Sequence, residues 1–476
     1  LPADQQKAEL IRIFDDIKAM GMNAVVLQVR PTDDTFYRSS LNPWSQYLTG
    51  VAGQDPGYDP LAFAVAEAHK RNLELHAWFN PYRVSMDTKR ESLPEGSFAK
   101  AHPEDVWAYG GKLYYDPGLP EAQQHIVDSI VEVVKNYDID AVHFDDYFYP
   151  YPSGTLDYPD AATFAKYGAG FTNKADWRRS NINHLVQAVS QAIKAEKPYV
   201  QFGISPFGIW RNKSASVPEG SDTAGSESYI ATSSDTRLWV KQGWLDYIAP
   251  QIYWSIGFRV ADYQKLTTWW ADVVRGTQTK LYIGHADYKV NANADPNWQK
   301  PGEIAKQLAL NLTMPEVAGS IHFSYKDLWR NPLGVKDDVS LAYQHPALIP
   351  VMDQLPGQAP EAPDQLKAKR VDGGIQLTWQ DADKQHGKQS GSGASDGQPG
   401  TSAYYVVYRA PVGQAIDFND ARFIVATVRR TTDKYKQAYL DTTADATRQY
   451  EYAVTAVDRL HHESPAGDSA TSQDGD

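Results

Sequence analysis

The chain has 476 residues, and 46 Lys and Arg stand against 59 Asp and Glu, which gives a net charge of −13. This acidic balance argues against nucleic acid or an anionic membrane surface as its main partner. The absence of cysteine excludes disulfides, thiolate metal sites and cysteine nucleophiles. Apolar residues make up 42% of the chain, close to the average for folded soluble proteins, and the length predicts two domains.

Short apolar segments rich in β-branched residues alternate with amphipathic helical segments over roughly the first 350 residues. The predicted strands are Asn23–Arg30, Leu73–Asn80, Asp140–Asp146, Val200–Ser205, Asp246–Tyr253, Lys280–His285 and Ala318–Ser324. The clearest predicted helices are Gln5–Met20, Pro60–Arg71, Glu121–Asn136, Trp177–Glu196 and Gly302–Asn311. Such alternation is typical of a parallel sheet covered by helices.

A closed (β/α)₈ barrel of the TIM type fits this pattern better than an open doubly wound sheet. No Gly-x-Gly-x-x-Gly turn follows any predicted strand, and polar residues gather where most strands end, as a barrel with one catalytic mouth requires. A closed barrel needs eight strands and seven are found, so we expect the first strand to lie upstream of Leu1. We also expect any signal or membrane segment to have been removed, because no run of about 18 apolar residues occurs.

A second, all-β domain is predicted after a proline-rich linker at 356–363. Its short alternating strands have no helix between them, which is typical of a small antiparallel sandwich. The block resembles a fibronectin type III domain through Trp379 and the late run Tyr450–Asp458. We therefore divide the chain into a barrel at 1–355, the linker, a sandwich at 364–467 and a disordered tail at 468–476. Asp381–Gly400 is predicted to be a mobile loop.

Period-two alternation along the predicted strands sends polar or aromatic side chains toward the barrel axis near the strand ends. The inward residues predicted in this way are Gln28, Arg30, His76, Trp78, Asn80, His143, Asp145, Gly203, Ser205, Gln251, Tyr253, His322 and Ser324. A purely structural layer would favour Val, Ile and Leu at these positions. The pattern therefore predicts an active or binding mouth.

Asp145 and Asp146 are the predicted catalytic pair. Two adjacent carboxylates repel each other, so one should have a raised pKa and act as a general acid while the other stays ionised. The alternative is a pair of loop-capping aspartates. Tyr147 opens the run Tyr147–Tyr151, whose rings suit stacking on sugar faces.

Further substrate-binding residues are predicted on the loops that follow the strands. Arginines at a barrel mouth can pair with a substrate carboxylate or with Asp145 itself. The loop residues assigned to this set are Tyr82, Arg83, Trp210, Arg211 and Trp254, alongside Arg30 and the inward residues His76, Trp78, Asn80, His143, Ser205, Gln251, Tyr253 and His322. Asp116 is predicted to be a turn residue, and Asp287, Glu227 and Asp235 are weaker candidates for a second carboxylate.

The inward histidines and carboxylates could also form a metal site. Histidine and carboxylate side chains bind Zn²⁺ in some barrels. The pattern has no His-x-His pair on one strand and no lysine placed to bridge two ions. We therefore predict no metal and no cofactor.

Several motifs together resemble the glycosyl-hydrolase-like lipoproteins of bacterial envelopes, and among them the enzymes that cleave peptidoglycan strands stripped of stem peptides. The motifs are Asn80–Val84, His143–Tyr149, Lys174–Arg179, Ser205–Asn212, Leu245–Trp254 and Trp269–Val274, within a resemblance that runs from Leu1 to Tyr343. The resemblance implies a (β/α)₈ barrel, a catalytic role for Asp145 and Asp146, and a lipid-anchored protein on the periplasmic face of the outer membrane. The anchor is absent from this chain. Asp287 and the sandwich depart from the family pattern.

The sequence therefore predicts a monomeric glycoside hydrolase of the cell envelope that acts on glycan strands of N-acetylamino sugars, above all on peptide-free peptidoglycan. Two alternatives stay open: a non-catalytic glycan-binding lipoprotein, and a metal-dependent hydrolase or deacetylase. The choice between retaining, inverting and substrate-assisted hydrolysis also stays open, although an adjacent Asp pair favours the third.

Overall fold

The computed structural model describes residues 1–382, 397–431 and 435–473. The chain divides into two compact units. One consists of Leu1–Ile13, Ala24–Glu67 and Glu74–Ala342, and the other of Phe14–Asn23, Ala68–Leu73 and Tyr343–Asp476. Within the described residues, no helix has the length and apolar character needed to span a membrane.

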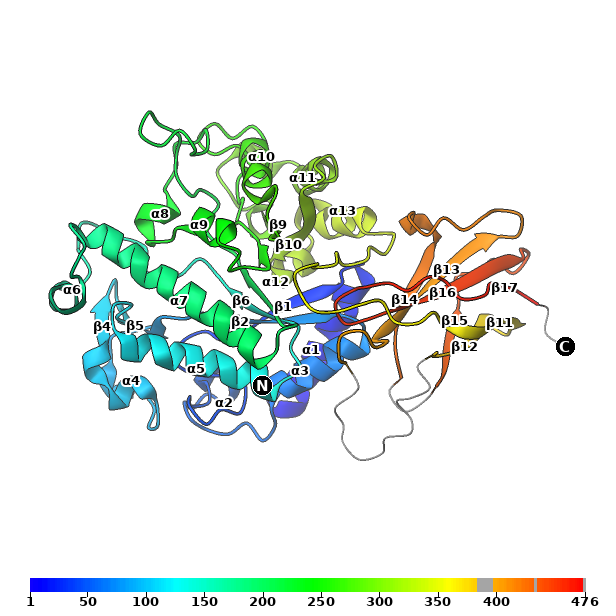
Figure 1. Ribbon diagram of the computed structural model, residues 1–476, viewed down its shortest axis with the longest axis horizontal. Coiled ribbons are helices and arrows are strands. Elements are labelled where there is room, and N and C mark those ends of the chain that lie inside the picture. Colours follow the sequence, from blue (N-terminus) through cyan, green and yellow to red (C-terminus); the bar gives the residue numbers. More distant parts are fainter. Residues whose placement is uncertain (383–396, 432–434, 474–476) are drawn as a thin grey trace. The chain divides into compact units, whose positions relative to one another are not determined.

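A parallel sheet of seven strands forms the centre of the first unit, and its strands lie side by side in chain order (Figure 1). The strands are β1 (Ala24–Arg30), β2 (Glu74–Phe79), β6 (Ala141–Phe144), β7 (Gln201–Ile204), β8 (Tyr247–Ile248), β9 (Lys280–Ala286) and β10 (Val317–Phe323). Each coincides with a predicted strand. This order is that of a (β/α) barrel, so the predicted fold class is confirmed; the eighth strand, which would precede Leu1, stays a prediction.

The helices follow the strands in alternation. The longer ones are α1 (Ala3–Ala19), α3 (Pro60–Lys70), α5 (Pro120–Asn136), α7 (Lys174–Glu196), α10 (Tyr263–Val274), α11 (Glu303–Leu312) and α13 (Val335–Ala342). The shorter ones are α2 (Gln46–Thr49), α4 (Phe98–Ala101), α6 (Ala161–Tyr167), α8 (Ser228–Ala231), α9 (Thr236–Lys241) and α12 (Tyr325–Arg330). In α5, Pro120 occupies the first turn, and Ile126, Ile130 and Val133 form a buried stripe at helical spacing.

The parallel sheet curls, which brings strands that are not neighbours within reach of each other. His76 of β2 and His143 of β6 both hydrogen-bond the phenol of Tyr247 on β8, at 2.9 and 2.8 Å. Strand β2 is separated from β8 by two other strands, so this contact crosses the concave side. Gly203 on β7 leaves room for the ring, because a Cβ there would lie 2.1 Å from it. These contacts place the His76 and His143 side chains on the concave side of the sheet, toward the barrel axis.

A small antiparallel sheet, which the sequence did not reveal, lies in the connection between β2 and α5. Its strands are β3 (Arg83–Ser85), β4 (Val106–Tyr109) and β5 (Lys112–Tyr115), in the order β3-β5-β4. It fixes the segment that follows β2, because Arg83 pairs with Tyr114 in its register. Asp116 just after β5 is a turn residue, as predicted, since it accepts hydrogen bonds from the Gly118 amide and the Thr163 hydroxyl.

The C-terminal part of the second unit consists of two antiparallel sheets, one of three strands and one of four. The strands are β11 (Asp364–Val371), β12 (Gly374–Gln380), β13 (Tyr404–Pro411), β14 (Ile424–Arg429), β15 (Lys436–Asp441), β16 (Tyr450–Val457) and β17 (Ala470–Thr471). Trp379 and Leu377 of the first sheet pack with Tyr405 and Val454 of the second in one buried cluster. The predicted small antiparallel sandwich is therefore confirmed.

Two local predictions for the sandwich have mixed outcomes. The prediction of a disordered tail from 468 onward is wrong for its first residues, because Ala470 and Thr471 pair with β16 and Ser472 is buried. The rest of that tail, 474–476, lies outside the described residues. So does 383–396, most of the predicted mobile loop.

Candidate active site

Asp145 lies directly after β6 and is buried, with 4% of its surface exposed. The Trp78 indole nitrogen of β2 donates to its Oδ2 at 2.9 Å, and the Tyr147 amide donates to its Oδ1 at 3.2 Å. Trp78 and His143 are register partners, which places Trp78 beside the end of β6. The sheet register thus brings together a carboxyl and an indole that are 67 residues apart in sequence.

Asp146 makes its own set of contacts. The Tyr151 hydroxyl donates to its Oδ2 at 2.5 Å, and the Gln251 amide donates to its Oδ1 at 3.1 Å. Gln251 is held in turn by the Ser205 carbonyl at 2.9 Å, and the Ser205 hydroxyl donates to the Ala249 carbonyl. Three loops after β6, β7 and β8 therefore converge on this carboxyl. We call the set Trp78, Arg83, Asp145, Asp146, Tyr147, Tyr151 and Gln251 the Asp145 cluster.

Burial and the neighbouring Asp146 charge raise the pKa of Asp145 to about 7. Burial also raises the pKa of Asp146, although the Tyr151 and Gln251 hydrogen bonds oppose that shift. One carboxyl of the pair can therefore hold a proton near neutral pH while the other is ionised. This is the electrostatic arrangement of a general acid beside a charged partner.

Arg83 is the cation associated with the pair. Its guanidinium lies 5.4 Å from the Tyr147 ring centroid, and its Nε donates to the Pro31 carbonyl at 3.1 Å. Its charge lowers the pKa of Asp145 and of Asp146, but by less than the hydrogen bonds to each carboxyl do. Arg83 therefore borders the carboxyl pair without neutralising it.

Aromatic rings with exposed surface border the same strand ends. Tyr147 is 39% exposed, Tyr288 39% and Phe323 42%. Phe323 stacks on Tyr253 at a centroid distance of 6.4 Å, and its edge meets Trp78 at 6.5 Å. Exposed ring faces beside a carboxyl pair suit a ligand with apolar C–H faces and hydroxyl groups, such as a sugar chain.

A buried polar chain lies on the axial side of the sheet near the Asp145 cluster. Glu74 contacts His76 at 3.3 Å, and Gln201 donates to the other oxygen of Glu74 at 2.9 Å. Tyr247, which the sequence analysis did not single out, joins His76 to His143 through its hydroxyl. Burial and the nearby His76 lower the pKa of His143 to about 3, so this imidazole is neutral. His76 and His143 are therefore buried residues that support the site through Tyr247.

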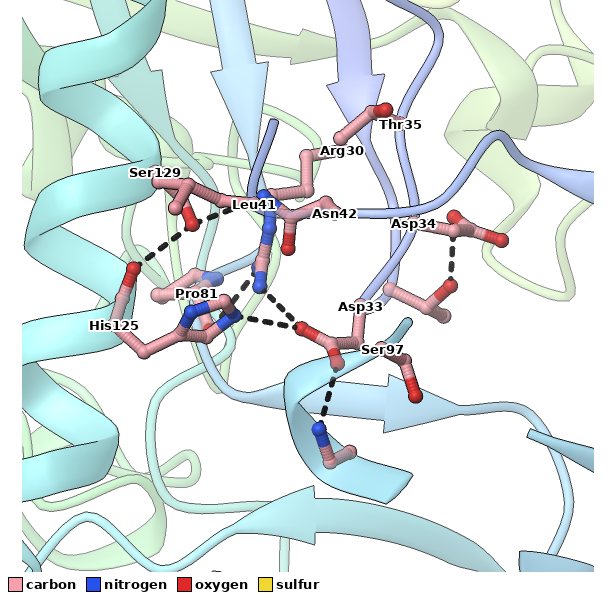
Figure 2. A network of polar contacts seen from close by, with 12 residues as sticks. Arg30, Asp33, Asp34, Thr35, Leu41, Asn42, Pro81, Ser97, His125 and Ser129 are labelled. Atoms are coloured by element: carbon pink, nitrogen blue, oxygen red, sulfur yellow. Dashed lines mark hydrogen bonds and ion pairs between the residues drawn. The ribbon is translucent and has the colours of Figure 1, made fainter. Parts of the chain in front are cut away.

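Arg30 is not in the mouth, and its predicted placement is wrong. A bulge between Gln28 and Arg30 shifts the register, so that Arg30 pairs with Phe79 instead of following Gln28 in strict alternation. The guanidinium turns to the helix side and bonds Asp33 at 2.8 Å, and Asp33 also contacts His125 of α5 at 3.1 Å (Figure 2). Arg30 is 1% exposed, which makes it part of a buried structural network.

His322 is also misplaced by alternation. It pairs in register with His285 and stacks on it at 5.2 Å, and His285 packs against Tyr263 of α10 and Gln307 of α11. His322 therefore faces the helices, where it binds Asp287 at 3.1 Å. Strand β10 therefore has its polar His322 on the helix side, where polar partners lie, and its apolar Phe323 on the side of the mouth. No signal in the strand itself distinguished the two faces.

Asn80 and Tyr82 are enclosed by the chain. Asn80 is 0% exposed and Tyr82 1% exposed. The Asn80 Oδ1 accepts from the Arg83 amide, so Asn80 shapes the turn that carries Arg83. The Tyr82 carbonyl accepts from the Tyr115 amide of β5, which ties this segment to the small sheet; the assignment of the two side chains to substrate binding stays a prediction.

Trp210 and Arg211 belong to a second cluster. Trp210 stacks on Trp269 of α10 at 5.9 Å and donates to Asp235 at 2.9 Å, and Arg211 lies over the Tyr229 ring. Trp254 packs edge-on against Phe207 of the loop after β7, at a centroid distance of 5.4 Å.

The alternative carboxylates are engaged elsewhere: Glu227 accepts from the Asn212 amide, and Asp287 binds His322. In the parts of the chain that the structure describes, no group of three His, Asp or Glu residues could hold a metal ion.

A parallel (β/α) sheet with an acid–carboxylate pair and exposed rings at its strand ends defines a glycoside-hydrolase-like protein. The family model for glycosyl hydrolase-like 10 matches residues 1–300, and the chain belongs to that family. The chain is 50% identical over 475 residues to the glycosyl hydrolase YngK of Bacillus subtilis, covering 99% of this chain and 89% of that protein. It is 46% identical over 332 residues to the glycosyl hydrolase DigH of Escherichia coli, covering 67% of this chain and 75% of that protein.

Solved structures resemble the chain more distantly. The glycoside hydrolase domain of PgaB from Bordetella bronchiseptica is 13% identical, with a TM-score of 0.45 over 71% of this chain and 93% of that chain. A fibronectin type III-like protein from Clostridium thermocellum is 22% identical over 25% of this chain and 97% of that chain, with a TM-score of 0.17. At these scores neither likeness adds to the fold described above.

Proposed function

We propose that the chain is a glycoside hydrolase that cleaves glycan strands of N-acetylamino sugars in the bacterial cell envelope, above all peptidoglycan strands without stem peptides. The observation that carries the proposal is the Asp145–Asp146 pair, in which Asp145 is buried and its pKa is raised to about 7. A carboxyl that is protonated near neutral pH beside an ionised one is what glycosidic bond cleavage needs. Membership of a glycosyl hydrolase-like family supports it.

The reaction that fits the pair best is substrate-assisted hydrolysis. Asp145 would donate its proton to the glycosidic oxygen as the bond to the anomeric carbon breaks. The acetamido oxygen of the substrate would attack that carbon, and ionised Asp146 would accept the acetamide N–H. Water would then attack the same carbon, reopen the ring and return a proton to Asp145. This route suits an adjacent Asp pair, because the other carboxylates that the sequence offered, Glu227, Asp235 and Asp287, are held by Asn212, Trp210 and His322.

Arg83 supports the choice of an anionic glycan. The chain carries a net charge of −13, so a carboxylate on the substrate has to be met by a local cation. Arg83 borders the Asp pair, and among the described residues its side chain donates one hydrogen bond, to the Pro31 carbonyl. A lactyl carboxylate on alternate sugars is a suitable partner for its remaining donors. Stem peptides on the same carboxyl would remove that charge and add bulk.

The test is incubation of the full chain with peptidoglycan from which an amidase has removed the stem peptides, followed by mass analysis of the soluble sugars. We expect new reducing ends from stripped strands and few from intact strands. Asp145→Asn is the matched variant, because it keeps the shape of the side chain and removes the acid. Release of sugars by this variant at the unchanged rate would exclude the proposed mechanism. Tight binding of strands by the unsubstituted chain without any cleavage would favour a non-catalytic glycan-binding protein.

A further inference from the structure

A second group of aromatic and basic side chains lies outside the Asp145 cluster. It consists of Arg179 of α7, Trp210 and Arg211 of the loop after β7, Tyr229 of α8, Arg237 of α9 and Trp269 of α10, and we call it the Trp210 cluster. The guanidinium carbons of Arg179 and Arg211 lie 4.0 and 4.3 Å from the Tyr229 ring centroid. That of Arg237 lies 5.5 Å from the Trp210 ring. Five separate elements thus contribute to one arrangement of cations on rings.

Two of the three arginines have no anionic partner among the described residues. Arg179 is paired with Asp176 at 2.6 Å. Neither the Arg211 nor the Arg237 guanidinium makes a hydrogen bond or an ion pair within the described parts of the chain, and the buried Nε of Arg211 has no partner. Both side chains are only half-buried, so their outer nitrogens can meet a ligand from solvent.

The carboxylates nearby are committed to other groups. Asp235 accepts from the Trp210 indole and caps the start of α9. Glu227 accepts from the Asn212 amide at 2.7 Å. Two guanidinium groups without a paired carboxylate are an unusual local feature in a chain of net charge −13. The planar guanidinium group can donate two parallel hydrogen bonds to the oxygens of a carboxylate.

One loop joins the two clusters. Phe207 lies 6.4 Å from the Tyr151 ring, whose hydroxyl donates to Asp146. Arg211 follows four residues later, and four extended residues span at most about 14 Å. Arg211 is therefore close enough to the Asp145 cluster for one glycan strand to contact both, with sugars only a few units apart.

We propose that the Trp210 cluster is a secondary binding site for a carboxylate-bearing glycan strand, in which Arg211 and Arg237 pair with sugar carboxylates beside the Trp210 and Trp269 rings. The identity of the glycan rests on the proposed function, but the recognition of an anionic strand does not. The site holds the strand beyond the point of cleavage and favours long anionic chains over short or neutral ones.

The experiment measures binding in the full chain carrying Asp145→Asn, so that cleavage cannot alter the ligand. The test variant adds Arg211→Gln and Arg237→Gln, which keep planar side chains for stacking and remove two charges. The matched control adds Lys265→Gln and Arg275→Gln instead, because these two cations lie on or beside α10 and are paired with Asp222 and Glu316. The probes are peptide-free peptidoglycan strands, the same strands with their carboxyl groups reduced to alcohols, and a glycerol phosphate polymer.

We expect the test variant to bind the carboxylate strands about tenfold more weakly than the control variant, with equal binding of the reduced strands. Equal binding of the carboxylate strands by both variants would overturn the proposal. So would an equal loss on the reduced strands, which would indicate damage to the fold, or a loss confined to the phosphate polymer. These results do not depend on hydrolysis, so a failure of the proposed function is seen separately, in the absence of sugar release.

Discussion

Two buried aspartates of the first unit differ in the way their carboxyls are held. Asp33 is 3% exposed and Asp145 is 4% exposed. Burial by itself raises the pKa of Asp33, but the His125 hydrogen bond and the Arg30 charge outweigh burial, and the net result is a lowered pKa. Asp145 accepts two N–H groups and contacts no cation among the residues that the structure describes, so burial and Asp146 raise its pKa to about 7. The same degree of burial thus gives opposite protonation preferences.

The difference shows what separates a structural carboxylate from a reactive one in this fold. A cation in direct contact compensates the charge and fixes a buried network in place. Where the cation lies over a neighbouring ring and not against the carboxyl, as Arg83 lies over Tyr147, the carboxyl keeps a proton that it can give away. Substitutions in the two places should therefore act on different properties, stability in one and chemistry in the other.

The largest expected effect is on stability, at Arg30. Arg30→Met removes the cation from Asp33 and leaves a buried carboxylate that still contacts His125 and the Ala99 amide. Breaking one side of a buried pair costs about 3–5 kcal/mol, because the other charge stays desolvated. Urea unfolding of the two proteins measures this loss. Arg83→Met is the control, and a similar loss in both variants would contradict the contrast between the two arginines.

The next effect is on catalysis, at Asp145. Asp145→Asn should lower turnover on peptide-free strands by at least about a hundredfold, the scale for losing a positioned acid group. The fold should persist, since the asparagine oxygen can still accept from the Trp78 indole. Reducing-end release and a circular dichroism spectrum together check this. Full turnover in a folded variant would remove Asp145 from the mechanism.

The pH dependence of stability should have opposite signs at the two sites. The pKa of Asp145 is raised in the folded state, so stability is lost as pH rises from about 4 to about 7 and the buried carboxyl ionises. Asp145→Asn removes that loss and should raise Tm above pH 7 by a few degrees, at roughly 2–4 °C per kcal/mol, with little change near pH 4.

Asp33 provides the opposite case. Its pKa is lowered in the folded state, so its contribution to stability is present above the ordinary carboxyl pKa and is lost as pH falls. Asp33→Asn should therefore lower Tm at neutral pH and do so less in acid. Differential scanning calorimetry between pH 4 and 8 would measure both variants. Parallel pH profiles for the two variants would show that their carboxyls do not differ as described.

The smallest expected effect concerns substrate choice, at Arg83. Arg83→Ala should raise the KM for strands that contain N-acetylmuramic acid by about fivefold, the size of one partly exposed ion pair, and leave chitin oligomers nearly unaffected. Initial rates on the two polymers at matched chain length measure the ratio. An equal change on both would assign Arg83 to the shape of the turn after β2 and not to carboxylate recognition.

The sequence alone located much of this architecture. Strand and helix periodicity predicted all seven parallel strands and the antiparallel sandwich, because hydrophobic spacing is a local property that burial in any fold must respect. It also pointed to Asp145 and Asp146, since strand ends in a barrel converge on one face. The motifs at Asn80–Val84 and His143–Tyr149 indicated the family that the comparisons show.

Only the tertiary structure decided which polar residues face the site. The bulge at Gln28 and Arg30 turned one predicted ligand into the partner of Asp33, and Asp287 after β9 holds His322 on the helix side. Neither orientation can be predicted from the strand sequence alone, because the direction of a side chain depends on the partners that neighbouring elements provide. The pKa of Asp145 has the same origin: its residue type is local, whereas its burial and its distance from cations belong to the fold.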